Sequence, residues 1–334
     1  MSLELNTTHC GSCEDLIPQI EPGSIACSVW SPPYHVGKEY ERGQTFTEWQ
    51  QMLRNVIGAH FSVLKPGGFM VVNIADILCY ADERMPRIQL PNVARLKSKV
   101  TREDVLRAKN EHPDFNRDQL AELLGCSEQT VDRRLNGNNI RGGKYSTQTR
   151  VELVGSKIVS YSDLAGMFLY DRRIWRKDPT WANSKWHSSS YRSVDEFEYL
   201  YIFWKPGETE IDRDRLSRQE WSDWGSRAVW DIRSVSSNRD HEAMFPVELP
   251  RRCIQLLTEP NDVVLDPFMG SGTTGRAAVQ LNREFIGIEK SEKYAKLANE
   301  STKFVDMDLL STEFPVARGM IHGRKGNQQV RENH

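Results

Sequence analysis

The sequence lacks the long apolar runs and the leader segment that mark membrane and secreted proteins. Its 334 residues contain no stretch approaching the ~20 consecutive apolar residues that a membrane-spanning helix needs. The first five residues, Met1 to Leu5, have neither the basic nor the apolar region of a signal peptide. We therefore expect a soluble globular protein of the cytoplasm with no membrane partner.

Cysteines are few, and their spacing favours neither a disulfide framework nor a zinc site. The chain has six, which should be reduced in a cytosolic protein. Cys10 and Cys13 have the spacing of half a zinc site, but no second Cys or His pair follows at a zinc-ribbon distance. We predict no metal site and interpret this segment as a turn between a strand and a helix.

The charge has no overall excess of either sign but is unevenly distributed. The formal net charge is −2, whereas residues 95–150 carry 12 Lys and Arg against 8 Asp and Glu. A local basic patch on a near-neutral protein suits an anionic ligand held in a cleft. Residues 311–334 have the composition of a flexible tail.

Short apolar runs alternate with amphipathic stretches, which predicts an α/β protein with a largely parallel sheet. Residues 169–175 and 198–204 are rich in aromatics and are expected to be two paired strands. Other strands are expected at 25–30, 69–74, 262–266 and 284–289, and helices at 46–64, 247–257, 273–281 and 292–304. The Lys65–Gly68 cluster is expected to end the first of these helices.

Residues 83–150 break this alternation and are predicted to be a mainly helical insertion between core segments 1–82 and 151–310. Within it, residues 117–135 resemble a helix-turn-helix, with Gly125 in the turn and Ser127 capping the second helix. The alternative is a helical hairpin used for packing or dimerisation. Arg141 could hold a phosphate, and the candidate DNA-binding residues are Gln129, Thr130, Arg133, Arg134 and Lys144. The outward positions of the second helix are Glu128, Gln129, Thr130, Asp132, Arg133 and Arg134.

A glycine-rich turn lies between an expected strand and an expected helix, and Glu289 ends the next strand. This order is typical of the first half of a nucleotide-type fold. The spacing is not that of a dinucleotide fingerprint, and the turn lacks the Gly-Lys-Ser/Thr of a phosphate loop. Asp266 would repel pyrophosphate but suits a sulfonium or an ammonium group. Candidate cofactor-binding residues are Asp266, Pro267, Phe268, Gly270, Ser271, Gly272, Thr273 and Glu289.

Ser31, Pro32, Pro33 and Tyr34 follow the expected strand at 25–30 and form a candidate catalytic turn. The exocyclic amino group of a base is a poor nucleophile because its lone pair is delocalised into the ring. The Ser31 hydroxyl and the Pro32 carbonyl could accept hydrogen bonds from its N–H groups, and two prolines make the turn rigid. Tyr34 offers a ring on which a flipped base could stack, a role that phenylalanine could also fill.

Together these motifs resemble the DNA amino-methyltransferases of the circularly permuted β class, in which the catalytic motif precedes the cofactor motif. Leu64–Gly68 and Phe197–Tyr199 match further family features, and Phe245 matches a residue that packs near the cofactor. The resemblance implies a Rossmann-like core, S-adenosyl-L-methionine as cofactor, and double-stranded DNA as substrate. It also implies that a cognate restriction endonuclease is a candidate partner. The expected oligomeric state is a monomer or a homodimer.

The resemblance leaves the target base open. Serine at the first position of the catalytic turn favours N4 of cytosine, with N6 of adenine as the alternative. Methylation at cytosine C5 needs a cysteine nucleophile, which the turn lacks. The family usually has Gly-Asp where this chain has Gly11-Ser12, with Asp15 a weak substitute, and it recognises DNA through the region of residues 206–240. The rival interpretations are a DNA-binding regulator with a silent methyltransferase fold and, less favoured, an RNA substrate.

Overall fold

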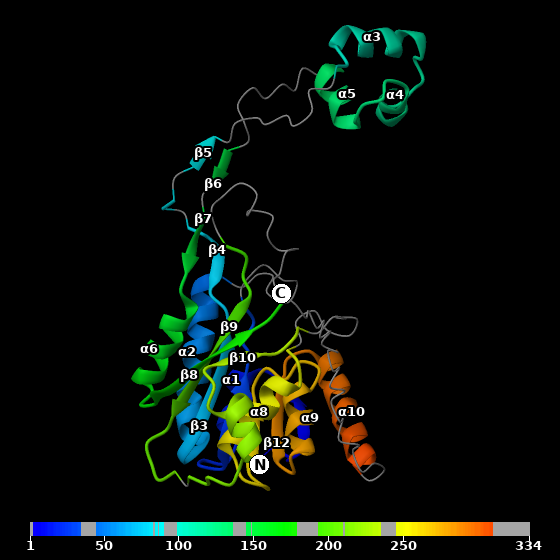
Figure 1. Cartoon of the computed structure of the whole chain (residues 1–334). Coiled ribbons are helices and arrows are strands. Elements are labelled where there is room, and N and C mark those ends of the chain that lie inside the picture. The colour runs from blue at the N-terminus through cyan, green and yellow to red at the C-terminus, as the bar shows by residue number, and fades with distance from the viewer. Residues whose placement is uncertain are drawn as a thin grey trace, which may run out of the picture. The chain divides into compact units, whose positions relative to one another are not determined.

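The structure is a computed structural model of the chain (Figure 1). It describes residues 3–34, 45–82, 84–85, 87–89, 99–135, 145–147, 149–178, 193–209, 211–234 and 245–309.

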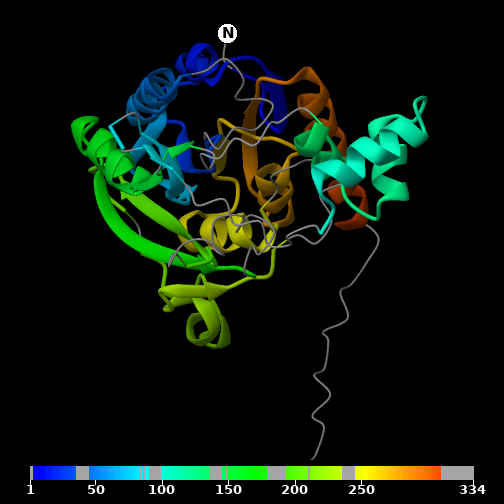
Figure 2. The same cartoon turned by 90° about the horizontal axis from the view of Figure 1, so that it is seen from above.

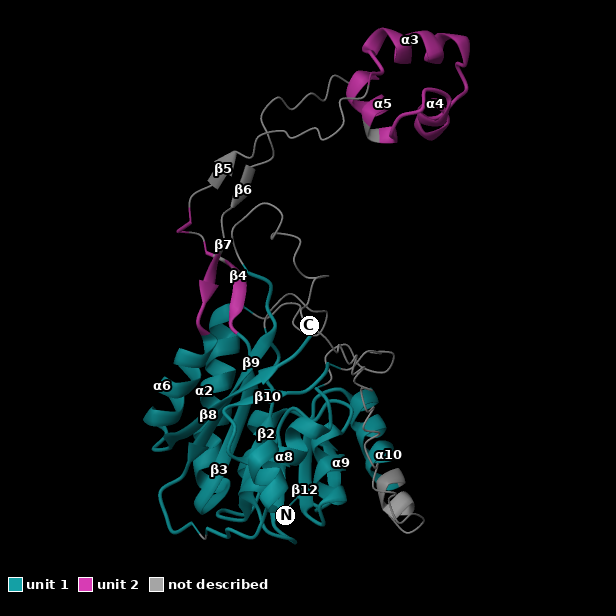
Figure 3. Cartoon of the chain, in the orientation of Figure 1, with its two compact units in different colours: residues 1–75, 154–334 teal, residues 76–153 magenta. Residues whose placement is uncertain are grey.

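The chain forms two compact units (Figure 3). The first consists of residues 1–75 and 154–334, and the second of residues 76–153. The second unit extends beyond the predicted insertion at both ends, because strands β4 (Ile77–Ala81) and β7 (Thr149–Glu152) pair with each other.

The first unit is built on an eight-stranded mixed sheet. Five neighbouring strands are parallel, and β9 runs antiparallel between β3 and β8. The predicted α/β fold with a Rossmann-like core is confirmed, as is the pairing of the two aromatic-rich strands. The strand order is β1 (Thr7–Cys10), β12 (Glu284–Glu289), β11 (Val263–Asp266), β2 (Ile25–Trp30), β3 (Leu64–Ile74), β9 (Phe197–Trp204), β8 (Phe168–Arg176) and β10 (Val229–Asp231).

Helices cover both faces of this sheet (Figure 2). One face carries α8 (Glu248–Leu257), α9 (Thr273–Gln280) and α10 (Glu292–Leu309). The other carries α1 (Cys13–Leu16), the short 3-10 helix η1 (Ile17–Gln19), α2 (Phe46–Val63) and α6 (Val154–Leu164). Thr45 begins α2 with a capping box closed by Glu48. Within the described parts of the chain, no helix combines the length and apolar character needed to cross a bilayer.

Helix α2 ends at Val63, just before the Lys65–Gly68 cluster as predicted, but β3 begins earlier than the predicted strand at 69–74. The cluster belongs to β3, which begins at Leu64 and pairs there with Ile25 of β2. The register shifts before the next pair, Phe69 with Cys27, so the extra residues are absorbed in the strand. Gly67 has φ +80°, and a Cβ there would meet the Glu208 carbonyl oxygen at 1.8 Å.

Part of the predicted recognition region packs into the core of the first unit. Residues 218–225 form α7 (Arg218–Glu220) and a π turn, η5 (Trp221–Gly225), and the short strand β10 follows. Trp224 and Trp230 are buried in the cluster that covers one face of the sheet. These two side chains therefore belong to the hydrophobic core of the first unit.

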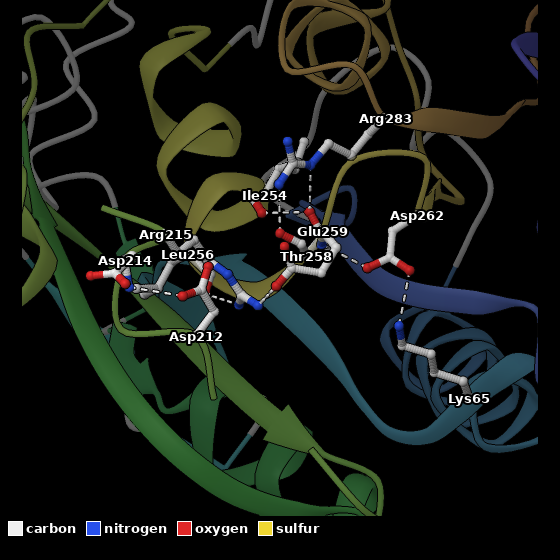
Figure 4. A network of polar contacts seen from close by, with 10 residues as sticks. All are labelled: Lys65, Asp212, Asp214, Arg215, Ile254, Leu256, Thr258, Glu259, Asp262 and Arg283. Carbon is white, nitrogen blue, oxygen red and sulfur yellow. Dashed lines mark hydrogen bonds and ion pairs between the residues drawn. The ribbon is translucent and has the colours of Figure 1, made fainter. Parts of the chain in front are cut away.

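A polar network fixes the beginning of this region to the loop before β11 (Figure 4). Arg215 donates to the Leu256 carbonyl at 2.8 Å and forms an ion pair with Glu259. In the same network, Lys65 pairs with Asp262 at 2.9 Å, and Arg283 donates to Thr258 Oγ1 at 3.0 Å. Asp262 directly precedes β11, so the Lys65–Asp262 pair lies at the amino end of that strand.

The second unit contains a three-helix cluster and four short strands. Helices α3 (Arg102–Glu111), α4 (Arg117–Leu123) and α5 (Glu128–Leu135) enclose a small core of Val105, Ala108, Leu120, Ala121 and Val131. Strand β5 (Arg87–Gln89) pairs with β6 (Tyr145–Thr147), alongside the β4–β7 pair. The insertion is thus less purely helical than predicted, because these strands are only three to five residues long and leave little mark on the sequence.

Candidate functional site

The predicted catalytic turn and the predicted cofactor turn come together at one edge of the sheet. Strands β2 and β11 are parallel neighbours, so Ser31 after β2 and Pro267 after β11 follow the same end of the sheet. The Trp30 ring contacts the Phe268 ring, with 5.4 Å between centroids. Segments more than 230 residues apart in the sequence thus form one site.

The cofactor turn has a backbone that only glycine adopts readily. Gly270 has φ +54° and Gly272 has φ +91°, both in the left-handed region. A Cβ on Gly272 would lie 2.7 Å from Ser301 Oγ and 3.0 Å from the Ala298 Cα. Helix α10 therefore packs against a turn that has no room for a side chain at this position.

Two carboxylates organise this turn. Asp266 accepts hydrogen bonds from the Phe268 N–H at 2.9 Å and from the Thr274 hydroxyl at 2.6 Å. Glu289, at the end of β12, accepts from the Gly270 N–H at 3.0 Å and from the Ser291 N–H at 2.8 Å. Each acidic side chain shapes the turn as well as placing negative charge beside it.

The other predicted cofactor residues lie in or near the same turn. Pro267 and Ser271 are buried, and Phe268 is half-buried against Trp30. Thr273 is buried at the first position of α9. Phe245 packs against the hydrophobic cluster to which Met269 of the turn also belongs.

The residues present fit S-adenosyl-L-methionine better than a phosphate-bearing cofactor. The ligand carries a sulfonium and an ammonium group, which two nearby carboxylates attract, and its ribose offers hydroxyls to Glu289.

Cys10 is exposed and Cys13 is buried, and the described residues contain no cluster of three potential metal ligands.

The catalytic turn is held in place from both sides. The Trp49 indole of α2 donates to the Pro33 carbonyl at 2.7 Å, and Pro32 is buried. The Ser31 hydroxyl lies 3.0 Å from Tyr34 Oη and 3.0 Å from the Asn73 carbonyl oxygen. The serine and the tyrosine of the turn are thus linked to each other and to the end of β3.

Two residues of this site, Glu198 and Asn73, carried no assigned role from the sequence. Tyr34 donates to Glu198 Oε2 at 2.6 Å, and Lys177 donates to Glu198 Oε1 at 2.6 Å. Asn73 is buried, and its Oδ1 has no hydrogen-bond partner among the described residues, although its Nδ2 donates to the Tyr199 carbonyl. Asn73 Oδ1 is thus a buried acceptor close to Ser31, and it could accept a hydrogen bond from an N–H group of a ligand.

The candidate DNA-binding residues of α5 differ in their surroundings. Gly125 has φ +58°, and the Thr130 N–H lies 3.3 Å from Ser127 Oγ, as predicted for the turn and the cap. Arg133 is exposed, whereas Arg134 is half-buried and donates to the Val100 carbonyl at 3.0 Å. Part of the Arg134 guanidinium is therefore engaged within the second unit, and its role in DNA binding stays a prediction.

The acidic residues of α5 are engaged within the second unit. Asp132 pairs with Arg117 at 2.7 Å, and Glu128 lies 3.6 Å from the same arginine. Thr130 is half-buried and contacts Ser127. Arg141, Lys144 and the Gln129 side chain lie outside the described residues.

The pKa of Asp266 predicts that cofactor binding depends on pH. Burial raises this pKa to about 7, the bonds from Thr274 and Phe268 oppose the rise, and Glu289 adds to it. A cationic ligand favours the ionised form, so its affinity should rise between about pH 5 and pH 7.5, with proton release on binding. Calorimetry in buffers of different ionisation enthalpy measures both quantities.

Asp266→Asn should remove this pH dependence, and Asp262→Asn, at the other end of β11, should retain it. An equal slope in the parent and the Asp266→Asn variant would assign the dependence to another group.

Comparison with known proteins places the chain in a family. The DNA methylase family of N6 and N4 methyltransferases matches residues 25–300. The chain is 56% identical over 301 residues to the Type II methyltransferase M.BglI of Bacillus subtilis, covering 90% of this chain and 86% of that protein. It is 42% identical over 299 residues to M.BglII of the same organism, covering 88% and 68%.

Solved structures show the same fold at low sequence identity. TTHA0409 of Thermus thermophilus, complexed with S-adenosyl-L-methionine, has a TM-score of 0.58 at 22% identity and covers 90% of this chain and 93% of that chain. The PvuII DNA methyltransferase, described as cytosine-N4-specific, has a TM-score of 0.58 at 18% identity, with coverage of 93% and 95%. The family match and the cofactor turn agree, and the chain belongs to the DNA methylase family as an S-adenosyl-L-methionine-dependent DNA methyltransferase.

Proposed function

We propose that this protein is a Type II modification enzyme that methylates the exocyclic amino group of a flipped base in double-stranded DNA, with N4 of cytosine as the favoured target. The observation that carries the proposal is the contact between Trp30, which directly precedes the catalytic turn, and Phe268 of the cofactor turn. It puts a hydroxyl acceptor for an amine, Ser31, next to the turn that suits the methyl donor. M.BglI and M.BglII are Type II methyltransferases by name, which supports the same class here.

The chemistry of an amino group explains the polar acceptors around Ser31. When bound, S-adenosyl-L-methionine supplies an electrophilic methyl group. The amine must present its lone pair, which acceptors for its N–H groups favour by making the nitrogen pyramidal. The Ser31 hydroxyl and the free Asn73 Oδ1 are two such acceptors, and the Pro32 carbonyl remains a third candidate.

One experiment tests the substrate and the target base together. DNA methylated by the protein is digested to nucleosides, and the modified nucleoside is identified by mass spectrometry. We expect N4-methylcytosine. N6-methyladenine would reverse the preference based on serine at the first position of the turn. Cofactor binding without any methylated DNA would favour the silent regulator, and methylated RNA alone would replace the substrate.

The exposed Arg133 on α5 leads to a prediction about sequence recognition. If it contacts a base edge, Arg133→Ala should relax specificity at one position, at a cost of ~1–3 kcal/mol. Sequencing the methylation pattern of the variant measures this. Arg107→Ala on α3 is the matched control, because Arg107 is also exposed but pairs with Asp104 at 2.7 Å.

An unchanged methylation pattern in the Arg133→Ala variant would favour packing or dimerisation as the role of the three-helix cluster. Recognition would then be sought in residues 206–240. The proposed restriction partner is tested separately, with a candidate endonuclease gene found beside the coding sequence. Cells that carry the endonuclease gene should survive only when they also carry the gene of this protein. Light scattering decides between the monomer and the homodimer.

A further inference from the structure

Glu198 is a buried carboxylate at the catalytic edge of the sheet, and methyl transfer alone does not explain its position. It lies near the start of β9, which runs antiparallel to β3, so it comes to the edge where β2 and β3 end. Its side chain is 9% exposed and that of its partner Lys177 is 14% exposed. A buried ion pair is costly to desolvate, so its presence beside Tyr34 calls for a reason.

The hydrogen bonds around Glu198 form a chain with one direction. Ser31 Oγ can donate to Tyr34 Oη at 3.0 Å, and Tyr34 Oη donates to Glu198 Oε2 at 2.6 Å. Lys177 holds the other carboxylate oxygen at 2.6 Å. The free end of the chain is the Ser31 oxygen, which can accept a hydrogen bond from an amine. Ser31 can also donate to the Asn73 carbonyl, so its proton has two alternative acceptors.

We propose that Ser31, Tyr34 and Glu198 form a proton relay that removes the proton released by methylation, with Lys177 holding the second oxygen of the Glu198 carboxylate. This inference rests on the proposed function of the site. It assigns the tyrosine hydroxyl a role beyond base stacking, and it makes Glu198 the terminal proton acceptor.

The relay balances the reaction. The lone pair of the amine forms the new N–C bond while the S–C bond breaks, and the electron pair of that bond stays on sulfur. The methylated nitrogen is then cationic. Its proton moves to Ser31 Oγ, the Ser31 proton moves to Tyr34 Oη, and the Tyr34 proton moves to Glu198 Oε2. Both hydroxyls are restored, and Glu198 returns its proton to solvent before the next turnover.

The charge of Glu198 also acts before the proton moves. A carboxylate at the end of the chain makes the Tyr34 and Ser31 oxygens better acceptors through cooperative polarisation. Positive charge develops on the amine nitrogen as the methyl group approaches, and a more electron-rich Ser31 oxygen stabilises it. The relay therefore affects the rate of the transfer itself, which makes it measurable.

Variants of the two relay residues test the chain. Glu198→Gln keeps an oxygen acceptor for Tyr34 but removes the charge, and Tyr34→Phe keeps the ring but removes the hydroxyl. Each should lower the single-turnover rate about 100-fold, a size typical of general base catalysis. Because both break one chain, the double variant should be no slower than the slower single variant. Calorimetry should give the parent affinity for S-adenosyl-L-methionine in all three.

Lys177→Gln tests whether the cation beside Glu198 matters to the reaction. Without the cation the carboxylate is held less firmly, so the single-turnover rate should fall, and Lys177→Arg, which keeps the charge, should recover most of the parent rate. Equal losses in both variants would assign Lys177 to packing and overturn its part of the proposal.

Asp262→Asn is the matched control, because it removes a Lys–carboxylate pair at the amino end of β11. It should leave the single-turnover rate unchanged. A Glu198→Gln rate within about 3-fold of the parent, or additive losses in the double variant, would overturn the relay. If Glu198→Gln fails to fold, the Tyr34→Phe rate decides: a loss below about 3-fold overturns it. Absence of DNA methylation by the parent protein would instead contradict the proposed function.

Discussion

Glu289→Ala should abolish measurable binding of S-adenosyl-L-methionine while leaving the chain folded. The Glu289 carboxylate accepts from the Gly270 N–H and the Ser291 N–H, so its loss releases the cofactor turn at two points. It also removes the acceptor expected for the ribose hydroxyls. Hydrogen bonds to a charged group contribute ~1.5–3 kcal/mol each, so losing two or more should weaken binding by more than about 100-fold.

Calorimetry with S-adenosyl-L-methionine measures this affinity, and thermal unfolding checks the fold. Glu292→Ala is the matched control, since Glu292 begins α10 three residues later and makes an exposed pair with Lys296. It should bind the cofactor like the parent. Glu289→Gln should be intermediate, because an amide oxygen can still accept one N–H bond. Near-parent affinity in Glu289→Ala would move the ribose contact to another residue.

Elements whose signals are local could be predicted from the sequence. The buried run at 25–30 and the glycine turn at 270–272 both appear where expected, because apolar runs and left-handed glycines leave marks in a few adjacent residues. Parallel neighbours in an α/β sheet end at the same edge, so the meeting of the two turns follows from the fold class. The match to the DNA methylase family is in agreement with this prediction.

Features that depend on distant pairing could not be predicted in this way. Glu198 contacts Tyr34 only because β9 reverses direction and pairs with both β3 and β8. The sequence marked residues 197–199 as a family feature but gave Glu198 no partner. The burial of Trp224 and Trp230 could not be predicted either, because an isolated tryptophan in a polar segment does not indicate which face of a sheet it packs against. The hydrogen bonds of the Tyr34 hydroxyl were also not predictable from the sequence. They give a reason to expect a lower methylation rate in Tyr34→Phe, whereas base stacking alone predicts little change.

The two units differ in how far the sequence determines a role. In the first, the proposed function assigns the acceptor groups, the glycines and the acidic residues to one reaction, so the role given to each restricts the roles open to the others. In the second, the helix-turn-helix pattern predicts α4, α5 and the Gly125 turn, but a packing hairpin would use the same apolar spacing. What the helices contact depends on their surface, where Arg117 and Arg134 are engaged internally and Arg133 is exposed.

Ser31→Ala should lower the rate of methyl transfer about 100- to 1,000-fold, the usual loss when one preorganised polar group is removed from a transition-state site. The Ser31 hydroxyl is the acceptor expected to contact the amine, and it joins Tyr34 to the Asn73 carbonyl at the end of β3. Its removal therefore eliminates the contact and loosens the turn. Affinity for S-adenosyl-L-methionine should remain within about 3-fold of the parent, because Ser31 makes no bond to the cofactor turn.

Single-turnover methylation of duplex DNA with labelled cofactor measures this loss, and calorimetry measures the affinity. Ser24→Ala is the matched control, because Ser24 lies just before the same strand and donates to the Glu21 carbonyl at 2.7 Å, far from the catalytic edge. It should methylate at the parent rate. Ser31→Thr keeps the hydroxyl on a bulkier side chain and should retain more activity than Ser31→Ala. A Ser31→Ala rate above about one-tenth of the parent would transfer the role of amine acceptor to Asn73 Oδ1 and the Pro32 carbonyl, which a combined Ser31→Ala and Asn73→Ala variant would then test.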